Sequence, residues 1–306
     1  MTDPAPALHQ PVLLEPVLEA ARGSSRVVDA TLGHGGHAAA LRAAGAEVLG
    51  IDRDPDAIRT ARARLGDVGV RYLNLPYDDP EAMAAAAAFA PGFVLLDLGV
   101  SSRQLDQVER GFTFRPGAPL DMRMGGTGPT ASDLLNLTSE AGLVRLFAEY
   151  GDERRSRALA REIVRRRGRR PMADSDDLVN AIRAVLGPRA GPPEFARLFQ
   201  AVRIGVNDEL EGLGRALPGF RDALRSDGKL AVITYHSGED RLVKLAFREW
   251  ASACICPPRQ PVCTCRGRAL GRLEPRKPIV PGESEVASNP RARSAKLRIF
   301  RVAHAA

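Results

Sequence analysis

The chain has 306 residues, of which 44% are hydrophobic and 26% charged, and its formal net charge is +7. This composition is typical of a soluble globular protein with a full core, and the length suits one large domain with an insertion, or two domains. The positive charge is compatible with a polyanionic partner, although basic proteins without a nucleic-acid ligand are also common. Aromatic residues make up only 5% of the chain, which argues against a base-stacking surface for single strands.

No apolar run approaches the ~20 residues that a membrane-spanning helix needs, so we expect no membrane contact. The segment from Met1 to Glu15 has neither a basic start nor an apolar core, which predicts that no secretory signal is present. A cytoplasmic protein is therefore expected.

A strand, a glycine turn and a helix are predicted between residues 27 and 44, the usual opening of a nucleotide-binding α/β sheet. Glycines in the turn let backbone N–H groups approach a ligand closely. The next apolar run ends in Asp52, whose carboxylate can accept hydrogen bonds from both hydroxyls of an adenosine ribose. The spacing Gly33-x-Gly35-x-x-Ala38 also fits the dinucleotide pattern, so the motif alone does not separate nicotinamide cofactors from S-adenosylmethionine. A turn that merely joins strand to helix is the structural alternative.

The pattern of strand and helix then repeats along the first third of the chain. Strands are expected at 48–51, 70–75 and 93–98, and helices at 55–65 and 80–89. The run from Phe93 to Leu98 is continuously apolar up to its acid, as buried parallel strands are. This alternation predicts a doubly wound parallel sheet of the α/β class.

The alternation stops after the fourth strand. From about Asp106 to about Asn207 only helical patterns appear, and the sheet resumes with a strand at 228–236 and a closing strand at 295–302. We therefore predict one α/β domain formed by residues 1–105 and 208–306. Residues 106–207 are predicted to form a helical insertion that recognises the substrate.

The insertion contains a basic run, with nine arginines from Arg154 to Arg170 against only Glu153 and Glu162. We interpret it as a contact for RNA phosphates. The alternative is a solvated helix face, because the arginines are expected to spread around the helix. Further basic residues toward the C-terminus would supplement this contact: Arg266, Arg268, Arg272, Arg276, Lys277 and those between Arg291 and Arg301.

Longer motifs resemble one particular family. They are Leu96-Asp97-Leu98-Gly99-Val100-Ser101-Ser102-Arg103-Gln104-Leu105, Gly111-Phe112-Thr113-Phe114-Arg115 with Pro119-Leu120-Asp121-Met122-Arg123-Met124, Ile233-Thr234-Tyr235-His236-Ser237-Gly238-Glu239-Asp240, His9-Gln10-Pro11-Val12-Leu13, Arg203-Ile204-x-Val206-Asn207-Asp208-Glu209-Leu210 and Asn289-Pro290-Arg291-Ala292-Arg293-Ser294-Ala295-Lys296-Leu297-Arg298. With these motifs the chain resembles the RsmH (MraW) family, nearly end to end from His9 to Arg301.

The resemblance implies a Rossmann-like class I methyltransferase fold with a helical insertion. It also implies S-adenosylmethionine-dependent methylation of N4 of a cytidine in the decoding region of 16S ribosomal RNA, with the small ribosomal subunit as partner. Whether the protein is a monomer or a homodimer stays open. Position by position, the family's cofactor contacts fall on Gly35, Gly36, His37, Asp52, Tyr77, Asp97 and Gln104. In the purely structural alternative, Asp97 is a capping acid and Gln104 is an amide on the surface.

Catalysis by such an enzyme rests mainly on alignment and on the exclusion of water. We hypothesise that Asp97, or an acceptor beside it, orients the target amine. Many amine methyltransferases carry an acid or amide with two prolines and an aromatic at this strand end, whereas this chain has Asp97-Leu98-Gly99-Val100. We therefore do not assume that this chain binds its target amine with the geometry of those enzymes. Candidates for holding the base are Ser101, Ser102, Asp121, Arg123 and His236, the last with a structural role as an equal alternative.

The four cysteines form two Cys-x-Cys pairs, Cys254 with Cys256 and Cys263 with Cys265. In a cytoplasmic protein such clustering suggests thiolate metal binding more than disulfides. However, Cys-x-Cys is tighter than the usual zinc knuckle, and only some family members carry these cysteines. Structural zinc, reduced thiols and disulfides therefore all stay open, and none bears on catalysis.

Two functions of other classes compete with a methyltransferase. A nicotinamide-dependent oxidoreductase is allowed by the glycine turn and Asp52, but no hydride-transfer acid such as a Tyr-x-x-x-Lys pair is identifiable. An inactive RNA-binding or assembly factor would have kept the fold without turnover. The intact residues at every family cofactor position argue against that second alternative.

Overall fold

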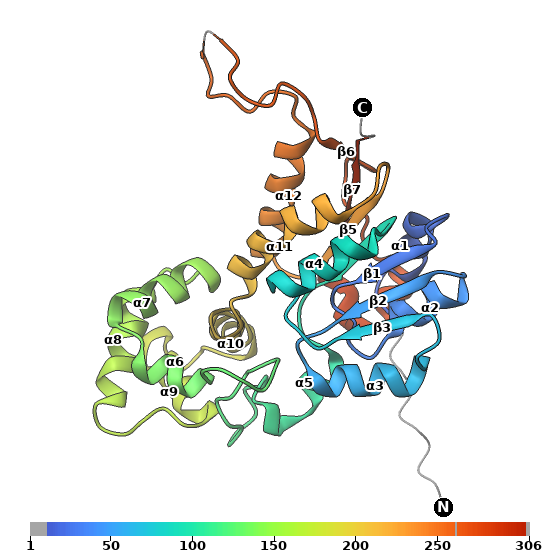
Figure 1. Cartoon of the computed structure of the whole chain (residues 1–306). Coiled ribbons are helices and arrows are strands. Elements are labelled where there is room, and N and C mark those ends of the chain that lie inside the picture. Colours follow the sequence, from blue (N-terminus) through green and yellow to red (C-terminus); the bar gives the residue numbers. More distant parts are fainter. Residues whose placement is uncertain (1–10, 261, 304–306) are drawn as a thin grey trace, which may run out of the picture. The chain divides into compact units, whose positions relative to one another are not determined.

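The computed structural model describes residues 11–260 and 262–303, without the side chains of Ser102 and Arg103 (Figure 1). His9 and Gln10, which begin the first family-like motif, lie outside the described residues. The chain divides into two compact units. The sheet unit comprises Met1–Gly99 with Leu210–Ala306, and the helical unit comprises Val100–Glu209.

One seven-stranded sheet organises the sheet unit, in the order β3-β2-β1-β4-β5-β7-β6. Its strands are β1 (Arg26–Asp29), β2 (Glu47–Ile51), β3 (Val70–Leu73), β4 (Phe93–Asp97), β5 (Lys229–Thr234), β6 (Gly271–Leu273) and β7 (Lys296–Val302). The first five strands pair in parallel, whereas β7 runs antiparallel to both β5 and β6. The chain moves outward from β1 to β3 on one side and from β4 to β5 on the other, so β1 and β4 flank a switch in strand order.

Helices cover both faces of this sheet (Figure 1). They are α1 (Leu14–Ala21), α2 (Gly36–Ala43), α3 (Pro55–Leu65), α4 (Pro80–Phe89), α11 (Glu209–Ala223), α12 (Ser237–Ala251) and α13 (Glu283–Ser288), with a 3-10 turn η3 (Pro290–Ser294). Successive strand residues point to opposite faces. Val27 accordingly packs in the core under α1 and α2, and Val28 in the core under α4, α11 and α12. Burial on both faces explains why these strands are continuously apolar.

The helical unit has a hydrophobic core of its own, around Leu135, Phe147, Ile163 and Leu198. Its elements are α5 (Ser102–Asp106), a 3-10 turn η1 (Val108–Arg110), α6 (Ala131–Leu137), α7 (Glu140–Arg145), a π-helical turn η2 (Leu146–Tyr150), α8 (Ser156–Arg167), α9 (Ser175–Leu186) and α10 (Pro192–Asn207). Within its described residues, β-structure is limited to an isolated bridge between Pro119 and Asp174.

The predicted α/β class with a doubly wound parallel sheet is confirmed. The short strand β6 was missed, because three residues are too few to show an alternating pattern. The compact units divide after Gly99 and Glu209, a few residues from the expected boundaries at 105/106 and 207/208. The assignment of the helical part to substrate recognition stays a prediction. Within the described ranges, no helix is both long and apolar enough to cross a bilayer.

Candidate functional site

Three acids stand at the carboxyl ends of neighbouring strands in the sheet unit. Asp29 is the last residue of β1, Asp52 follows β2, and Asp97 is the last residue of β4. Ligands of open α/β sheets bind at this edge, where the strand order switches. The switch between β1 and β4 therefore places the candidate site beside Asp29 and Asp97.

The glycine turn between β1 and α2 has a backbone that only glycine adopts without strain. Gly33 and Gly35 have positive φ angles of 51° and 73°, and Gly35 is the N-cap of α2. A Cβ on Gly35 would lie 3.0 Å from Leu65 Cδ1, and one on Gly36 would lie 2.8 Å from Pro11 Cγ. No side chain caps the start of α2, so its first N–H groups are available to an acceptor.

Asp52 holds this glycine turn in place. Its Oδ2 accepts a hydrogen bond from the Gly33 N–H at 2.8 Å, and its Oδ1 accepts one from the Asp54 N–H at 2.8 Å. Burial raises the pKa of Asp52 to about 6, against the opposing effect of these two donors. Each carboxylate oxygen keeps a second lone pair, so Asp52 retains the capacity to accept hydroxyl groups of a ligand.

Asp97 is bonded on three sides but is still reached by solvent. Its N–H donates to Thr31 Oγ1 at 2.6 Å, and its Oδ1 accepts the Tyr235 hydroxyl at 2.8 Å. The other oxygen, Oδ2, lies 3.6 Å from His37 Nδ1, and the side chain is 24% exposed. Burial raises the pKa of Asp97, while His37 and the Tyr235 hydroxyl act in the opposite direction.

His37 is held by two contacts inside the protein. Its Nε2 lies 2.9 Å from the carbonyl oxygen of Val12, which accepts a hydrogen bond from it, and its Nδ1 lies 3.6 Å from Asp97 Oδ2. The His37 side chain is only 6% exposed. The His37 side chain is thus committed inside the protein, and a ligand can meet this residue through its backbone.

Asp29 was not among the predicted site residues, although it belongs to the same group of acids. Its side chain is only 1% exposed, and burial raises its pKa to about 7. His37 opposes this rise, whereas Asp97 and Asp52 add to it. An acid at the end of an otherwise apolar strand, directly before a glycine turn, was the available sequence signal.

Tyr235 is a second group that the sequence did not single out. It follows β5, and its N–H donates to Glu239 Oε2 at 2.8 Å while its hydroxyl binds Asp97. Burial raises the pKa of this phenol far above its usual range, so the hydroxyl remains a donor.

Tyr77 was among the predicted cofactor contacts. It lies after β3 and is half-buried against the core beneath α4.

His236 caps a helix. It is the N-cap of α12, where its Nδ1 accepts the Glu239 N–H at 3.4 Å. Its buried Nε2 lies 3.2 Å from Glu239 Oε1 without the alignment of a hydrogen bond. The structural alternative for His236 thus has a concrete basis, and its contact with substrate stays a prediction.

The predicted residues of the helical unit form two local pairs. Gln104 is buried rather than a surface amide, since its Oε1 accepts the Ser101 N–H at 3.0 Å and its N–H donates to Ser101 Oγ at 3.2 Å. Asp121 and Arg123 form a two-pronged ion pair, with Nε to Oδ1 at 2.8 Å and Nη2 to Oδ2 at 2.7 Å. This pairing lowers the pKa of Asp121. Ser102 begins α5, and its side chain lies outside the described part of the structure.

Several arginines of the basic run around α8 have partners within the helical unit. Arg167 reaches the carbonyl oxygens of Leu135 and Thr138, at 2.8 Å and 2.7 Å. Arg155 and Arg170 also have partners, the Val185 carbonyl and Asp177.

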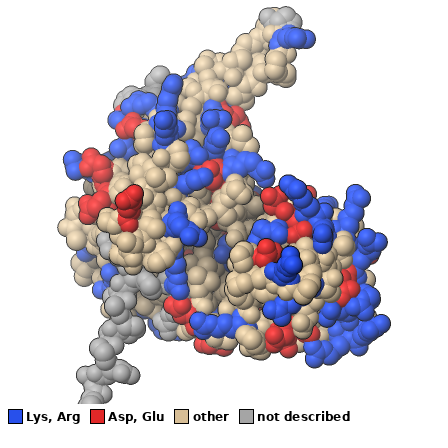
Figure 2. All heavy atoms as spheres, turned by 180° about the vertical axis from the view of Figure 1, so that it is seen from behind, with Lys and Arg blue, Asp and Glu red and all other residues tan. Residues whose placement is uncertain are grey.

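Within α8, Arg157, Arg161 and Arg165 are exposed and spaced four residues apart, which puts them on one helix face; Arg165 also pairs with Glu162. We call this group the arginine stripe. Arg154, Arg155, Arg169 and Arg170, outside α8, are exposed too, so the spread of arginines over the basic run stays a prediction. On the face shown in Figure 2, blue side chains gather along the outer edge of the helical unit.

Comparison with known proteins agrees with the predicted family. The model of the MraW methylase family matches residues 6–303. The chain is 55% identical to Ribosomal RNA small subunit methyltransferase H of Gemmatimonas aurantiaca, over 96% of this chain and 95% of the relative. Proteins of that name from Rubrobacter xylanophilus and Heliobacterium mobile are 46% and 45% identical, over 99% and 95% of this chain and 98% and 97% of theirs.

Among solved structures, an rRNA methylase from Streptococcus thermophilus aligns with 95% of this chain and 94% of its own. Its TM-score of 0.40 and identity of 12% are too low to carry an argument. The sequence relatives and the family model do carry one, because they cover nearly the whole chain at high identity. The chain belongs to the MraW methylase family.

Proposed function

We propose that this protein transfers a methyl group from S-adenosylmethionine to N4 of a cytidine in the decoding region of 16S ribosomal RNA. The observation that carries the proposal is the identity of 55% to a small-subunit rRNA methyltransferase, over 96% of this chain. The sheet unit supports it with a glycine turn and three acids at the edge where such folds bind ligands.

The residues at this edge fit a cationic methyl donor. Gly35 and Gly36 let the turn pack closely against Leu65 and Pro11, with no room for a Cβ, and the uncapped start of α2 suits a carboxylate. Asp52 can accept hydrogen bonds from ribose hydroxyls. The ring of Tyr77 would stack on one face of the adenine. The carboxylate of Asp97 would face the positively charged sulfonium end of S-adenosylmethionine. We also assign Gln104 a cofactor contact, in keeping with its position in the family motif.

When bound, S-adenosylmethionine supplies an electrophilic methyl group on a sulfonium, which passes to the amine nitrogen as the S–C bond breaks. The amine then has to lose one proton. Asp97 provides an acceptor at the strand end, and its carboxylate is steered by Tyr235 on one oxygen and by His37 on the other. Orientation of the amine by Asp97 also draws its lone pair out of conjugation with the cytosine ring. We keep Ser101, Ser102, Asp121, Arg123 and His236 as candidates for holding the base.

The arginine stripe of α8 supplies the contact with RNA phosphates. Guanidinium groups bind phosphate oxygens through two parallel hydrogen bonds, and such contacts set position rather than sequence preference. In the described part of the chain, neither Arg157 nor Arg161 pairs with a carboxylate. Arg161 Nε donates to the Arg157 carbonyl at 3.4 Å, and both side chains are exposed. The partner implied is the RNA of the small ribosomal subunit.

The deciding experiment follows labelled methyl from S-adenosylmethionine into small subunits that lack their own methylation, with the product nucleoside identified. N4-methylcytidine is expected, and Asp52→Ala should abolish it through loss of the cofactor. Asp97→Asn should bind the cofactor more weakly, because it loses the charge that faces the sulfonium, and at saturating cofactor it should still lose most turnover, since an amide cannot take the proton. Label on another nucleoside would refute cytidine N4 as the target of methylation. Cofactor binding without any transfer would instead favour an inactive RNA-binding factor.

A further inference from the structure

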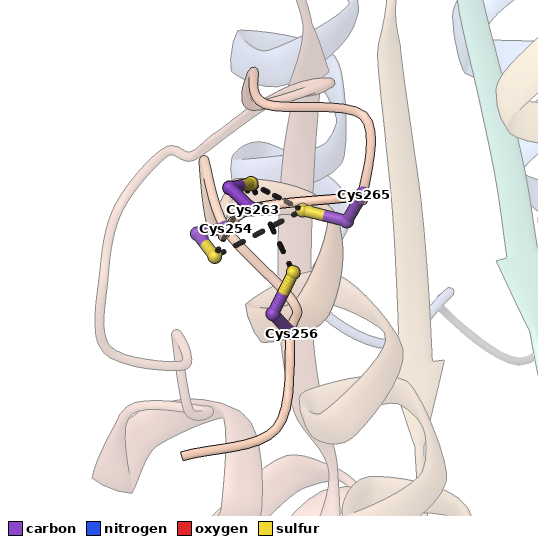
Figure 3. Close-up of side chains that lie close together, drawn as sticks. All are labelled: Cys254, Cys256, Cys263 and Cys265. Carbon is purple, nitrogen blue, oxygen red and sulfur yellow. Dashed lines mark hydrogen bonds between the residues drawn. The ribbon is translucent and has the colours of Figure 1, made fainter. Parts of the chain in front are cut away.

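All four cysteines lie on one excursion of the sheet unit, between the end of α12 at Ala251 and the start of β6 at Gly271. Cys254 and Cys256 are on its outgoing arm, and Cys263 and Cys265 are on its returning arm. Figure 1 shows the excursion in orange, standing out beyond α12. In Figure 3 the four sulfur atoms from the two arms turn toward one another.

The distances between these sulfurs are those of a metal cage. The Sγ atom of Cys263 lies 3.9 Å, 3.8 Å and 3.5 Å from those of Cys254, Cys256 and Cys265, and Cys265 lies 3.9 Å from Cys254. All four sulfurs lie within 4.8 Å of one another. A tetrahedral zinc ion with Zn–S bonds of about 2.3 Å requires S···S separations of about 3.8 Å. A disulfide would require about 2.05 Å instead.

We propose that Cys254, Cys256, Cys263 and Cys265 together bind one zinc ion in a closed structural site. Four thiolates fill the tetrahedron and leave no position open for water or substrate, so the site has no part in the methyl transfer. Tetrahedral sulfur coordination is the arrangement that zinc takes in proteins, with iron as the main competitor.

The tight Cys-x-Cys spacing fits this site because the ligands come from two arms. Where a backbone is extended, residues i and i+2 share a face, so one arm can offer both of its sulfurs to a single ion. Backbone donors add to this arrangement: the Ile255 N–H donates to Cys265 Sγ at 3.3 Å, and the Thr264 N–H points to Cys256 Sγ. Such N–H···S contacts stabilise the charge on thiolates.

The excursion needs a staple because it buries little apolar surface. Its described residues between the end of α12 and the start of β6 form no helix or strand, and Ile255 and Val262 are 43% and 68% exposed. At its base, Arg266 donates to the carbonyl oxygens of Glu249 and Ser252, which attaches the returning arm to the end of α12. Beyond that point metal binding replaces a hydrophobic core, as in other small metal-held segments.

The first test measures metal in the full-length protein purified under reducing conditions. We expect one equivalent of zinc per chain, and replacement by Co²⁺ should give the visible spectrum of a tetrahedral tetrathiolate. Cys256→Ser and Cys263→Ser each remove one ligand, one from each arm. Each should weaken zinc binding by more than about 100-fold, beyond the effect of outer-shell changes. Val262→Ser is the matched control on the same excursion, and it should keep its zinc.

A second readout follows the excursion itself. Trypsin should cut after the exposed Arg259 faster when a chelator removes the zinc, and Cys256→Ser should be cut at that faster rate without chelator. Methyl transfer should continue in both cases. Four thiols that react freely with a thiol reagent after zinc is added would overturn the proposal. A disulfide between the arms, or iron as the only bound metal, would overturn it too.

Discussion

The two units of this protein carry charge in opposite ways. The sheet unit collects acids at one strand edge, where Asp29 is buried and Asp97 is 24% exposed, and both are linked to neighbours. The helical unit carries its arginine stripe on an exposed helix face, where Arg157 and Arg161 reach outward. A small cationic donor is best bound by a few buried acids, because a low dielectric strengthens each contact. A large polyanion is better met by many exposed cations.

The difference extends to how each region is built. At the sheet edge the side chains are fixed by partners far away in sequence: Tyr235 lies 138 positions from Asp97, and Val12 lies 25 positions from His37. Such a site is organised before its ligand arrives. The arginine stripe depends only on the register of α8. We therefore expect changes at the sheet edge to be severe and specific, and changes in the stripe to be graded and sensitive to salt.

The largest effect is expected at the glycine turn. Gly35→Val forces a branched side chain into a positive φ and against Leu65, so the glycine turn proposed to bind the cofactor should be displaced. Calorimetric titration with S-adenosylmethionine should detect no binding. Gly45→Val is the control at the other end of α2, where φ is +94° and a Cβ meets nothing within 4 Å. It should cost about 1–2 kcal/mol of stability and leave cofactor affinity intact. Equal losses in both variants would show that strain alone, rather than the site, is responsible.

The next effect concerns the buried charge of Asp29. Its folded pKa of about 7 lies above the model value of 3.8, so between these values the native state holds a proton that the unfolded chain has lost. Through Asp29, the free energy of unfolding should therefore fall as pH rises from about 4 to about 7, by at most about 4 kcal/mol at 1.36 kcal/mol per pKa unit. Asp29→Asn has no such charge, so its stability should fall less over this window and exceed that of the wild type at pH 8. The fall that remains comes from Asp52 and Asp97, whose pKa values are also raised by burial.

This prediction can be checked by urea unfolding at pH 5 and pH 8. Fluorescence of Trp250, the one tryptophan of the chain, reports on the core of the sheet unit, where this residue is 4% exposed. Asp67→Asn, at a side chain that is 75% exposed, is the matched control and should keep the wild-type pH dependence. If Asp29→Asn keeps it as well, the charge of Asp29 is not the cause.

A smaller, salt-dependent effect is expected from the arginine stripe. The double variant Arg157→Glu with Arg161→Glu should weaken binding to small-subunit RNA about tenfold or more. It should also reduce the salt slope by about 1.5, because each phosphate contact contributes about 0.7–0.9. Arg241→Glu with Arg248→Glu changes the charge equally on exposed positions of α12. Filter binding over a range of salt concentrations compares the RNA affinities of the two double variants. Identical salt slopes in both would show that the arginine stripe does not contact RNA.

Local pattern was enough to predict much of this molecule. The glycine turn, the acid after the second strand and the buried fourth strand all follow from short-range rules, and the parallel sheet follows from their order. The three-residue β6 carries no such pattern and was missed. The arginine stripe needed the bounds of α8, Ser156–Arg167, because they show which arginines of the run belong to the helix. Sequence reasoning expected the arginines to spread around the helix.

Contacts between distant segments were out of reach. The sequence around Asp97 does not indicate that Tyr235 and His37 contact its two carboxylate oxygens. Likewise, the sequence around Asp29 does not indicate how deeply this residue is buried. Asp121 and Arg123 were proposed to hold a base, but their closest partners are each other. Sequence finds which residues have suitable chemistry, whereas the fold decides which of them are already engaged.

The smallest predicted effect tests that engagement directly. The Tyr235 hydroxyl lowers the pKa of Asp97, so Tyr235→Phe should raise it. A hydrogen bond to a charged group is worth about 1.5 kcal/mol, which corresponds to about one pKa unit. If methyl transfer needs ionised Asp97, the acidic limb of the rate profile should move up by about one pH unit, while the rates at pH 9 stay equal. Tyr72→Phe, which removes a hydroxyl that donates to the Gly66 carbonyl, should leave the profile unchanged. An unmoved limb in Tyr235→Phe would mean that ionisation of Asp97 does not govern the reaction, and its role as proton acceptor would fall.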